Sequence, residues 1–189
     1  MRQEAARCRD ALARAAAGAT VALISSGDSG VYGMAGLAIE LGHKEFSGVF
    51  IEVVPGVTAA SAAAARLGAP LMVDFAVISL SDLLVEWDVI RKRLEAAAGA
   101  DFVTAIYNPR SQTRVRQLDE AVEIFLRHRD PSTPCGIACA VGSEDEAISI
   151  TTLGELLRQD IDMRTVLIIG NSSSRLIDGR LVTLRGYEI

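Results

Sequence analysis

Residues 25–36 read Ser-Ser-Gly-Asp-Ser-Gly-Val-Tyr-Gly-Met-Ala-Gly, and residues 54–60 read Val-Pro-Gly-Val-Thr-Ala-Ala. Each stretch follows a short run of β-branched and apolar residues, at 20–24 and at 50–54, and leads into an Ala- and Leu-rich pattern that suits a helix. Two such strand–turn–helix units place two loops at the carboxyl ends of neighbouring parallel strands, where small ligands bind in open α/β sheets. We therefore expect an α/β enzyme that acts on a small molecule.

The spacing of the glycines excludes two common phosphate-binding motifs. Glycine recurs at every third position of residues 27–36, which differs from the Gly-x-Gly-x-x-Gly of dinucleotide folds, and no Gly-Lys-Ser or Gly-Lys-Thr follows. Asp28 lies inside the turn, where its carboxylate would repel a phosphate and would suit ligand hydroxyls, an amine or a positive centre. An equally good interpretation makes Asp28 the N-cap of the following helix.

Composition narrows the class of protein further. The chain has 189 residues, half of them hydrophobic, and no apolar run approaches the ~20 residues of a membrane span. Its first residues do not resemble a signal peptide, so a cytoplasmic location without membrane contact is expected. The formal net charge of −5 argues against general nucleic-acid binding. Cys8, Cys135 and Cys139 are expected to be buried thiols, and no metal site is predicted.

Hydrophobic periodicity predicts an alternation of helices and strands. Helices are expected near residues 2–17, 31–42, 57–67, 86–98 and 111–128. Strands are expected near residues 20–25, 50–54, 75–79, 102–107, 134–141, 147–152 and 166–170, with the pair 134–141 and 147–152 antiparallel, and a hairpin is expected at Asp178-Gly179.

A punctuated linker at Leu67-Gly68-Ala69-Pro70 divides the predicted elements into two domains. Residues 1–70 would form an amino-terminal α/β domain, and residues 71–189 a carboxy-terminal α/β domain with a mixed sheet. Because a two-stranded parallel sheet is too small to be stable by itself, the first domain is expected to be incomplete at its amino end.

Several motifs together resemble the tetrapyrrole methyltransferases of cobalamin synthesis. The motifs shared across that superfamily are Gly27-Asp28 and Pro55-Gly56-Val57-Thr58-Ala59. Two further motifs resemble the branch that methylates C17 of precorrin-3B, namely Ser79-Leu80-Ser81-Asp82-Leu83-Leu84 and Tyr107-Asn108-Pro109-Arg110-Ser111. The resemblance covers essentially the whole chain.

The resemblance implies two α/β domains with a cleft between them for S-adenosylmethionine (SAM), usually in a homodimer. It implies transfer of a methyl group from the sulfonium to C17 of precorrin-3B, or of its cobalt form, with ring contraction to precorrin-4. The family's amino-terminal strand and its Gly-x-Gly-Pro-Gly loop are not matched in this chain, which leads us to expect low activity of the chain by itself.

The resemblance also assigns roles to individual residues. The residues expected to line SAM are Ser26, Gly27, Asp28, Val31, Thr58, Ala59, Asn108 and Gly170. Asn108 and Gly170 would close on the adenine, while Thr58 and Ala59 would offer a hydroxyl and N–H groups to the methionine carboxylate. No catalytic base is named, because a sulfonium leaves as a neutral thioether and the site mainly needs positioning and exclusion of water.

The residues expected to contact the tetrapyrrole are Arg110, Tyr107 and Ser81. Arg110 would pair with a precorrin carboxylate, and it is the best candidate among three arginines that follow the turn. Arg114 and Arg116 fit equally well as solvated charges at the start of a helix.

Two other functions remain open at the level of the sequence. One is a related methyltransferase that acts at C11, C20 or C2 of the macrocycle, or on diphthine; it would share the two superfamily motifs but lack the motifs of the C17 branch. The other is a non-catalytic SAM-binding form, suggested by the unmatched amino-terminal loop.

Overall fold

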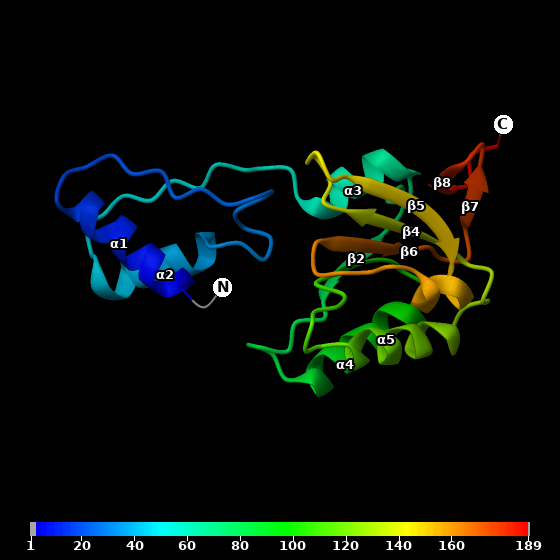
Figure 1. Cartoon of the computed structure of the whole chain (residues 1–189). Helices are drawn as coiled ribbons and strands as arrows, with labels where there is room; N and C mark the ends of the chain where they lie inside the picture. The colour runs from blue at the N-terminus through cyan, green and yellow to red at the C-terminus, as the bar shows by residue number, and fades with distance from the viewer. Residues whose placement is uncertain (1–2, 189) are drawn as a thin grey trace. The chain divides into compact units, whose positions relative to one another are not determined.

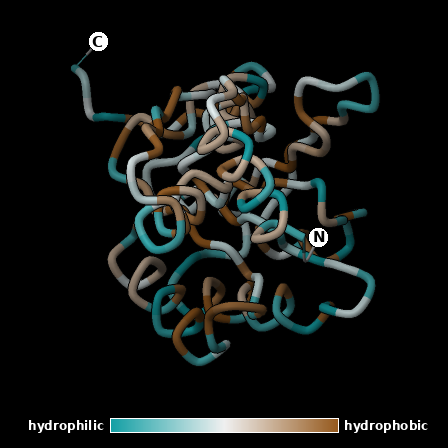
Figure 2. The backbone as a smooth tube through the Cα atoms, turned by 90° about the vertical axis from the view of Figure 1, so that its left-hand side faces the viewer, coloured by the Kyte–Doolittle hydropathy of each residue, from teal (hydrophilic) through white to brown (hydrophobic). Residues whose placement is uncertain are grey.

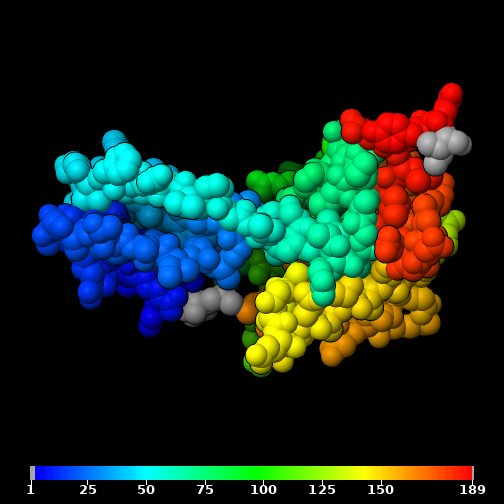
Figure 3. Space-filling view, turned by 90° about the horizontal axis from the view of Figure 1, so that it is seen from above, coloured from blue at the N-terminus to red at the C-terminus, as the bar shows by residue number. Residues whose placement is uncertain are grey.

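A computed structural model describes residues 3–188 and forms two compact units, Met1–Ala59 and Ala60–Ile189. We call these the amino-terminal and carboxy-terminal units. The boundary lies earlier than the linker predicted at residue 70, because helix α3 (Ala59–Leu67) and strand β1 (Gly68–Ala69) pack with the second unit. Strand β1 pairs in parallel with β8 (Arg180–Thr183), and the two segments lie side by side in the space-filling view (Figure 3).

The amino-terminal unit is built on two helices. Helix α1 (Glu4–Ala16) and helix α2 (Ala35–Glu45) match predicted helices, although α2 begins four residues later than expected. Their buried contact residues are Cys8, Leu12, Ala38 and Leu41. An ion pair of 2.8 Å between Arg9 Nε and Glu45 Oε2 also joins the two helices.

The two strands predicted in this unit, at 20–25 and 50–54, are not formed. In the stretch at 50–54, buried and exposed side chains do alternate at its start. Val49 and Ile51 pack on the helices, whereas Phe50 between them is 87% exposed. A strand, however, also requires a hydrogen-bonded neighbour. In the part of the chain that the structure describes, neither stretch belongs to a sheet. The strand prediction was wrong because the pattern reports burial and not backbone pairing.

The carboxy-terminal unit contains a five-stranded mixed sheet in the order β2–β3–β6–β4–β5 (Figure 1). Its strands, all at or within two residues of predicted positions, are β2 (Phe75–Ser79), β3 (Val103–Tyr107), β4 (Pro134–Cys139), β5 (Ala147–Thr152) and β6 (Thr165–Ile169). Strand β3 runs parallel to β2 and antiparallel to β6, and β4 runs antiparallel to β5, as predicted, and to β6.

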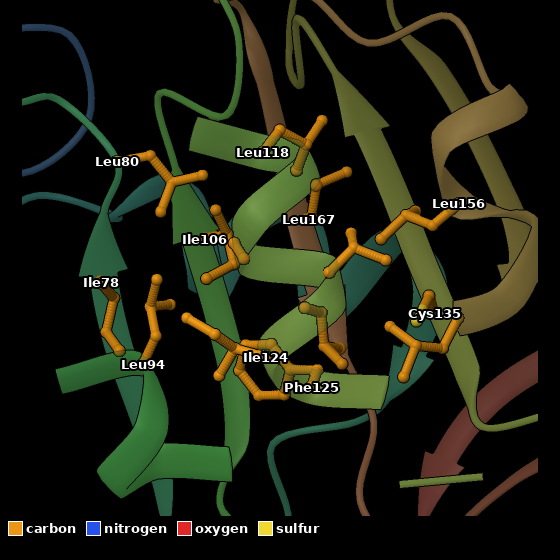
Figure 4. Close-up of a cluster of buried hydrophobic side chains, with 14 of the residues drawn as sticks. Ile78, Leu80, Leu94, Ile106, Leu118, Ile124, Phe125, Cys135, Leu156 and Leu167 are labelled. Atoms are coloured by element: carbon orange, nitrogen blue, oxygen red, sulfur yellow. The ribbon is translucent and has the colours of Figure 1, made fainter. Parts of the chain in front are cut away.

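Three helical segments cover one face of this sheet. They are α4 (Trp87–Gly99), α5 (Arg116–Leu126) and a 3-10 helix, η1 (Leu153–Arg158). Their apolar side chains meet those of the sheet in one buried cluster, in which Leu94, Ile106, Phe125 and Leu156 are prominent (Figure 4). None of the helices in the described residues is long and apolar enough to cross a bilayer.

Helix α3 packs on the opposite face of the sheet. Gly136 of β4 has no side chain there, and a Cβ atom at that position would lie 2.4 Å from a methyl group of Leu67. Its strand neighbours, Cys135 and Ile137, belong instead to the buried cluster on the first face. The alternation along β4 therefore fixes which helix covers each face.

A second, three-stranded sheet has the order β1–β8–β7, in which β7 is Ser174–Ile177. Strands β7 and β8 form the predicted hairpin, and Asp178 and Gly179 have φ values of 47° and 75°. A type I′ turn requires positive φ at both of its central residues, and Asp-Gly meets this requirement well.

The backbone tube, coloured by hydropathy, shows apolar stretches alternating with hydrophilic ones along the chain (Figure 2).

The cysteines are free thiols, and Cys8 and Cys135 are buried, as predicted, whereas Cys139 is half-buried. Burial raises the pKa of the Cys135 thiol to about 12, although the Gly170 backbone and Arg129 act in the opposite direction. A buried thiol with so high a pKa is a packing group and a poor nucleophile.

We predict that the core of the carboxy-terminal unit depends on Phe125. Its side chain is fully buried, so Phe125→Ala should lower the free energy of unfolding by about 3–5 kcal/mol. The neighbouring Leu126 is partly exposed, and Leu126→Ala should cost about 1 kcal/mol or less. Urea unfolding, followed by the fluorescence of Trp87, measures both. Equal losses in the two variants would contradict this description of the core.

Candidate functional site

Asp28 joins the two glycine loops of the amino-terminal unit. Its Oδ1 accepts the N–H of Gly30 at 2.8 Å, and its Oδ2 accepts the N–H of Gly56 at 2.9 Å. One carboxylate therefore holds the first loop, residues 26–34, against the second loop, residues 54–58. Helix α2 begins only after Met34, so the interpretation of Asp28 as its N-cap was wrong.

These hydrogen bonds keep Asp28 ionised. The N–H of Gly56 contributes most to lowering the pKa of the carboxyl, the N–H of Gly30 comes next, and partial desolvation opposes them. A hydrogen bond to the charged form favours that form. The first loop thus carries a fixed negative charge at neutral pH, and each carboxylate oxygen keeps a lone pair for a further donor.

Close backbone approach explains why glycine is needed in these loops. A Cβ atom on Gly56 would lie 2.2 Å from the carbonyl oxygen of Gly27, and one on Gly33 would lie 2.3 Å from that of Ser29. Gly27 also has a φ of 75°, which favours glycine. Gly36, in contrast, has open space around it. Glycine at positions 27 and 56 therefore allows the backbones of the two loops to come into direct contact.

The structure places most predicted SAM residues of this unit on the two joined loops. Ser26, Gly27, Asp28 and Val31 lie on the first loop, and Thr58 ends the second, directly before α3. Ala59 is the first residue of α3. The first turn of a helix has N–H groups without partners inside the helix, a suitable surface for a carboxylate.

In the carboxy-terminal unit, the ends of β2 and β3 lie side by side, with Ser79 opposite Tyr107. Asn108 follows with a φ of 50°, a conformation that Asn tolerates, and its Nδ2 donates to Ser79 Oγ at 3.0 Å. The N–H of Ser81 donates to the same oxygen at 3.2 Å. Ser79, which sequence reasoning did not assign, therefore brings together the predicted residues Asn108 and Ser81.

Tyr107 is buried and anchors α3. Its hydroxyl accepts the N–H of Ala60 at 2.7 Å, in a buried hydrogen bond. The end of β3 and the start of α3 are thereby joined within one unit. The hydroxyl of Tyr107, one of the residues expected to contact the substrate, is thus hydrogen bonded to the first turn of α3, the helix that follows Thr58.

Two of the three arginines after the turn form ion pairs along α5. Arg110 Nη2 lies 2.8 Å from Asp119 Oδ1, and Arg116 Nε lies 2.7 Å from Glu120 Oε1. The Nε of Arg110 is buried and has no partner among the described residues. Arg110 therefore has one ion pair and further N–H groups with which an anion could bind.

Arg114 is buried, so the interpretation of it as a solvated charge was wrong. Its Nη1 donates to the carbonyl oxygen of Asn108 at 2.5 Å, and its Nε lies 3.9 Å from Asp82 Oδ1. Burial lowers the pKa of the guanidinium, and Asp82 acts in the opposite direction. A guanidinium remains charged even so, and Arg114 thus ties the turn at Asn108 to the loop that contains Asp82.

Gly170 lies at the other end of the sheet from Asn108. Strand β6 is antiparallel to β3, with Ile169 opposite Thr104, so Gly170 comes next to the start of β3 while Asn108 follows its end. The structure therefore does not bring together Asn108 and Gly170, which were expected to contact the same adenine. The pattern of a buried strand carries no information about its direction.

A cavity of about 750 Å³ opens at the Gly170 end of the sheet. Several polar groups that line it have partners within the fold: Arg129 donates to the carbonyls of Gly170 and Phe102, and Asp101 Oδ2 accepts from Ser172 Oγ at 2.5 Å. The buried Nε of Arg129, in contrast, has no hydrogen-bond partner among the described residues. None of the residues predicted to bind SAM, Gly170 included, is among the residues that line this cavity. Each unit therefore has its own candidate region: the joined glycine loops in the amino-terminal unit, and the carboxyl ends of β2 and β3 in the carboxy-terminal unit.

Comparison with known proteins identifies the family. Residues 2–157 match the family model described as Tetrapyrrole (Corrin/Porphyrin) Methylases, and the chain belongs to this family. It is 48% identical to the cobalt-factor III methyltransferase of Priestia megaterium over 192 residues, with 100% of this chain and 36% of that protein aligned. It is 47% identical to a probable cobalt-factor III C(17)-methyltransferase of Salmonella typhimurium, with 100% of this chain and 78% of that protein aligned. The chain thus spans about a third of the first relative.

Solved structures agree with this assignment. The methyltransferase CobJ superposes with a TM-score of 0.87 at 40% identity, covering 96% of this chain and 77% of that one. Uroporphyrin-III C-methyltransferase of Thermus thermophilus, complexed with S-adenosylhomocysteine, shares the fold with a TM-score of 0.64 at 23% identity, covering 86% of this chain and 71% of that one. The predicted α/β fold of the tetrapyrrole methyltransferase type is confirmed.

The contact between the glycine loops predicts opposite effects for two glycine substitutions. Gly56→Ala should destabilise the amino-terminal unit by about 1–3 kcal/mol, because its Cβ cannot coexist with the carbonyl of Gly27. Gly36→Ala, in α2 with open space, should be neutral or stabilising by up to about 1 kcal/mol. Thermal unfolding followed by circular dichroism measures both. A loss in Gly36→Ala as large as that in Gly56→Ala would contradict the contact.

Asp28 should titrate below its ordinary pKa of 3.8. The pKa of Asp28 is lower in the folded chain than in the unfolded chain. The ionised carboxylate therefore stabilises the fold at any pH above the unfolded-state pKa, and this stabilisation is lost as the pH falls through the folded-state pKa. The stability advantage of the native chain over Asp28→Asn should therefore shrink as the pH is lowered through this range. A carboxyl ¹³C NMR titration reads the pKa directly. A midpoint at or above the ordinary value would show that the two N–H groups do not hold the carboxylate.

Proposed function

We propose that the chain is a SAM-dependent C-methyltransferase that methylates C17 of precorrin-3B, or of its cobalt form, with ring contraction to precorrin-4 in cobalamin synthesis. The observation that carries the proposal is that the two motifs of the C17 branch meet in the fold. They end the neighbouring strands β2 and β3 and are hydrogen bonded through Ser79. The names of the relatives, cobalt-factor III and C(17)-methyltransferases, support the same reaction.

SAM would bind on the joined glycine loops and at the start of α3. The residues proposed to hold it are Ser26, Gly27, Asp28, Val31, Thr58, Ala59 and Asn108. The fit rests on the ionised Asp28, whose remaining lone pairs would accept ligand hydroxyls or an amine. It rests also on the first turn of α3, which would receive the methionine carboxylate.

SAM, when bound, supplies an electrophilic methyl group on a sulfonium. The task of this chain is then to align that methyl group with the ring carbon and to exclude water. Hydrogen bonds hold the groups that would do so in place. Asp28 holds the two glycine loops together, Tyr107 holds the start of α3, and Ser79 holds the side chain of Asn108. No side chain is proposed to remove a proton from the substrate.

The substrate would be held at the carboxyl ends of β2 and β3. Arg110 is proposed to bind a carboxylate of the tetrapyrrole through N–H groups outside its ion pair with Asp119, and Ser81 is proposed to lie nearby on the adjoining loop. The resemblance described above further supports a homodimer in the cytoplasm, and we include both in the proposal.

Binding of the demethylated product, S-adenosylhomocysteine, tests the cofactor site. We expect micromolar affinity by calorimetry, and at least a tenfold loss, about 1.4 kcal/mol, in Asp28→Ala and in Thr58→Val. Asp10→Ala provides the matched control, because Asp10 is an exposed carboxylate on α1 with a single ion pair. Unchanged affinity in both site variants would contradict the assigned residues.

The reaction is tested by incubating the chain with SAM and precorrin-3B and reading the position of the added methyl group by NMR. Methylation at C17 supports the proposal. Methylation at another carbon would move the chain to a different branch of the family, and SAM binding without turnover would favour the non-catalytic interpretation.

A further inference from the structure

The loop between β2 and α4, residues 80–86, is anchored at both of its ends. Leu80 is fully buried, and its N–H donates to the carbonyl of Tyr107 at 2.9 Å. Val85 packs against the buried cluster of the carboxy-terminal unit. The middle of the loop is therefore fixed relative to the sheet. We call it the leucine loop because of the two residues at its tip.

Those two residues, Leu83 and Leu84, are directed into solvent. They are 68% and 99% exposed, although burial of a leucine side chain is favourable. A single exposed leucine needs no explanation, but two adjacent ones on an anchored loop form a small apolar surface that suits a contact with another molecule.

The tip is also held from the side by α5. Gln117 Nε2 donates to Asp82 Oδ2 at 2.8 Å, and the buried Arg114 lies 3.9 Å from the other oxygen of that carboxylate. Arg114 also donates to the carbonyl of Asn108. The apolar tip and the turn that leads to Arg110 are thus fixed to each other by one buried charge, at the same edge of the sheet.

We infer that Leu83 and Leu84 form an apolar contact with the ring of the tetrapyrrole substrate, at the edge of the sheet that also carries the turn leading to Arg110, the arginine proposed to bind a substrate carboxylate. This inference rests on the proposed function. Its basis is the match in chemistry: the substrate class has a large ring with an apolar face and carboxylate arms, and this edge offers an apolar tip next to a guanidinium.

The experiment is a titration of precorrin-3B, read by quenching of Trp87. Trp87 is the one tryptophan of the sequence and begins α4, three residues after Leu84. The double variant Leu83→Ser/Leu84→Ser should raise the Kd for precorrin-3B about tenfold or more. Its Kd for S-adenosylhomocysteine, measured by calorimetry, should change less than twofold. Leu83→Met/Leu84→Met keeps apolar side chains and should bind precorrin-3B within about twofold of the native chain.

A matched control removes another exposed apolar pair, Leu176 and Ile177 on β7, which are 59% and 43% exposed. Leu176→Ser/Ile177→Ser should bind precorrin-3B as the native chain does. Equal affinity in the leucine-loop serine variant and the native chain would overturn the inference, as would an equal loss in the control pair. Light scattering measures the oligomeric state of the same variants. If the leucine-loop serine variant is monomeric where the native chain is a dimer, and binds precorrin-3B as well as the native chain does, then the tip contacts a second copy and the inference is wrong.

The outcome also separates this inference from the proposed function. A native chain that binds precorrin-3B and S-adenosylhomocysteine, together with an unaffected leucine-loop variant, would overturn only the role of the leucines. A native chain that binds neither molecule would overturn the proposed function and this inference with it.

Discussion

The direction of β3 relative to its two neighbours determines the geometry of the carboxy-terminal unit. Because β3 is parallel to β2, the residues that follow both strands gather at one edge of the sheet. Because β6 is antiparallel to β3, the residues that follow β6 are carried to the opposite edge. The motifs after β2 and β3 can therefore share a ligand, while the turn after β6 contributes to the fold at the other end.

Much of the carboxy-terminal unit was predictable from local pattern. Strands β2 and β5 begin and end at the predicted residues, and the Asp178-Gly179 hairpin follows from turn chemistry that few other residue pairs satisfy. These elements were predictable because their signals are local. The strands expected at 20–25 and 50–54 failed because pairing depends on a neighbour that a local pattern does not specify.

The candidate site shows the same division between local and long-range information. The sequence pattern predicted Asp28 in a turn that faces a ligand. Its hydrogen bond with Gly56, 28 residues away, shows that the carboxylate also holds the two glycine loops together. Arg114 looked like a surface charge on a helix, and only its contacts with Asn108 and Asp82 make it a buried support. Roles that arise from side chains distant in sequence could not be read from the motifs alone.

The difference between the two thiols of β4 bears on how the protein can be studied in solution. Burial raises the pKa of the Cys135 thiol to about 12, so it stays protonated at neutral pH, and burial also shields it from reagents. Cys139 is half-buried at the carboxyl end of the same strand, and β4 is parallel to β3 through their shared neighbour β6. A maleimide dye or a spin label directed at Cys139, once Cys8 is shown to stay unmodified, would therefore be attached at the edge of the sheet where Asn108 lies, and would report on it without an engineered cysteine.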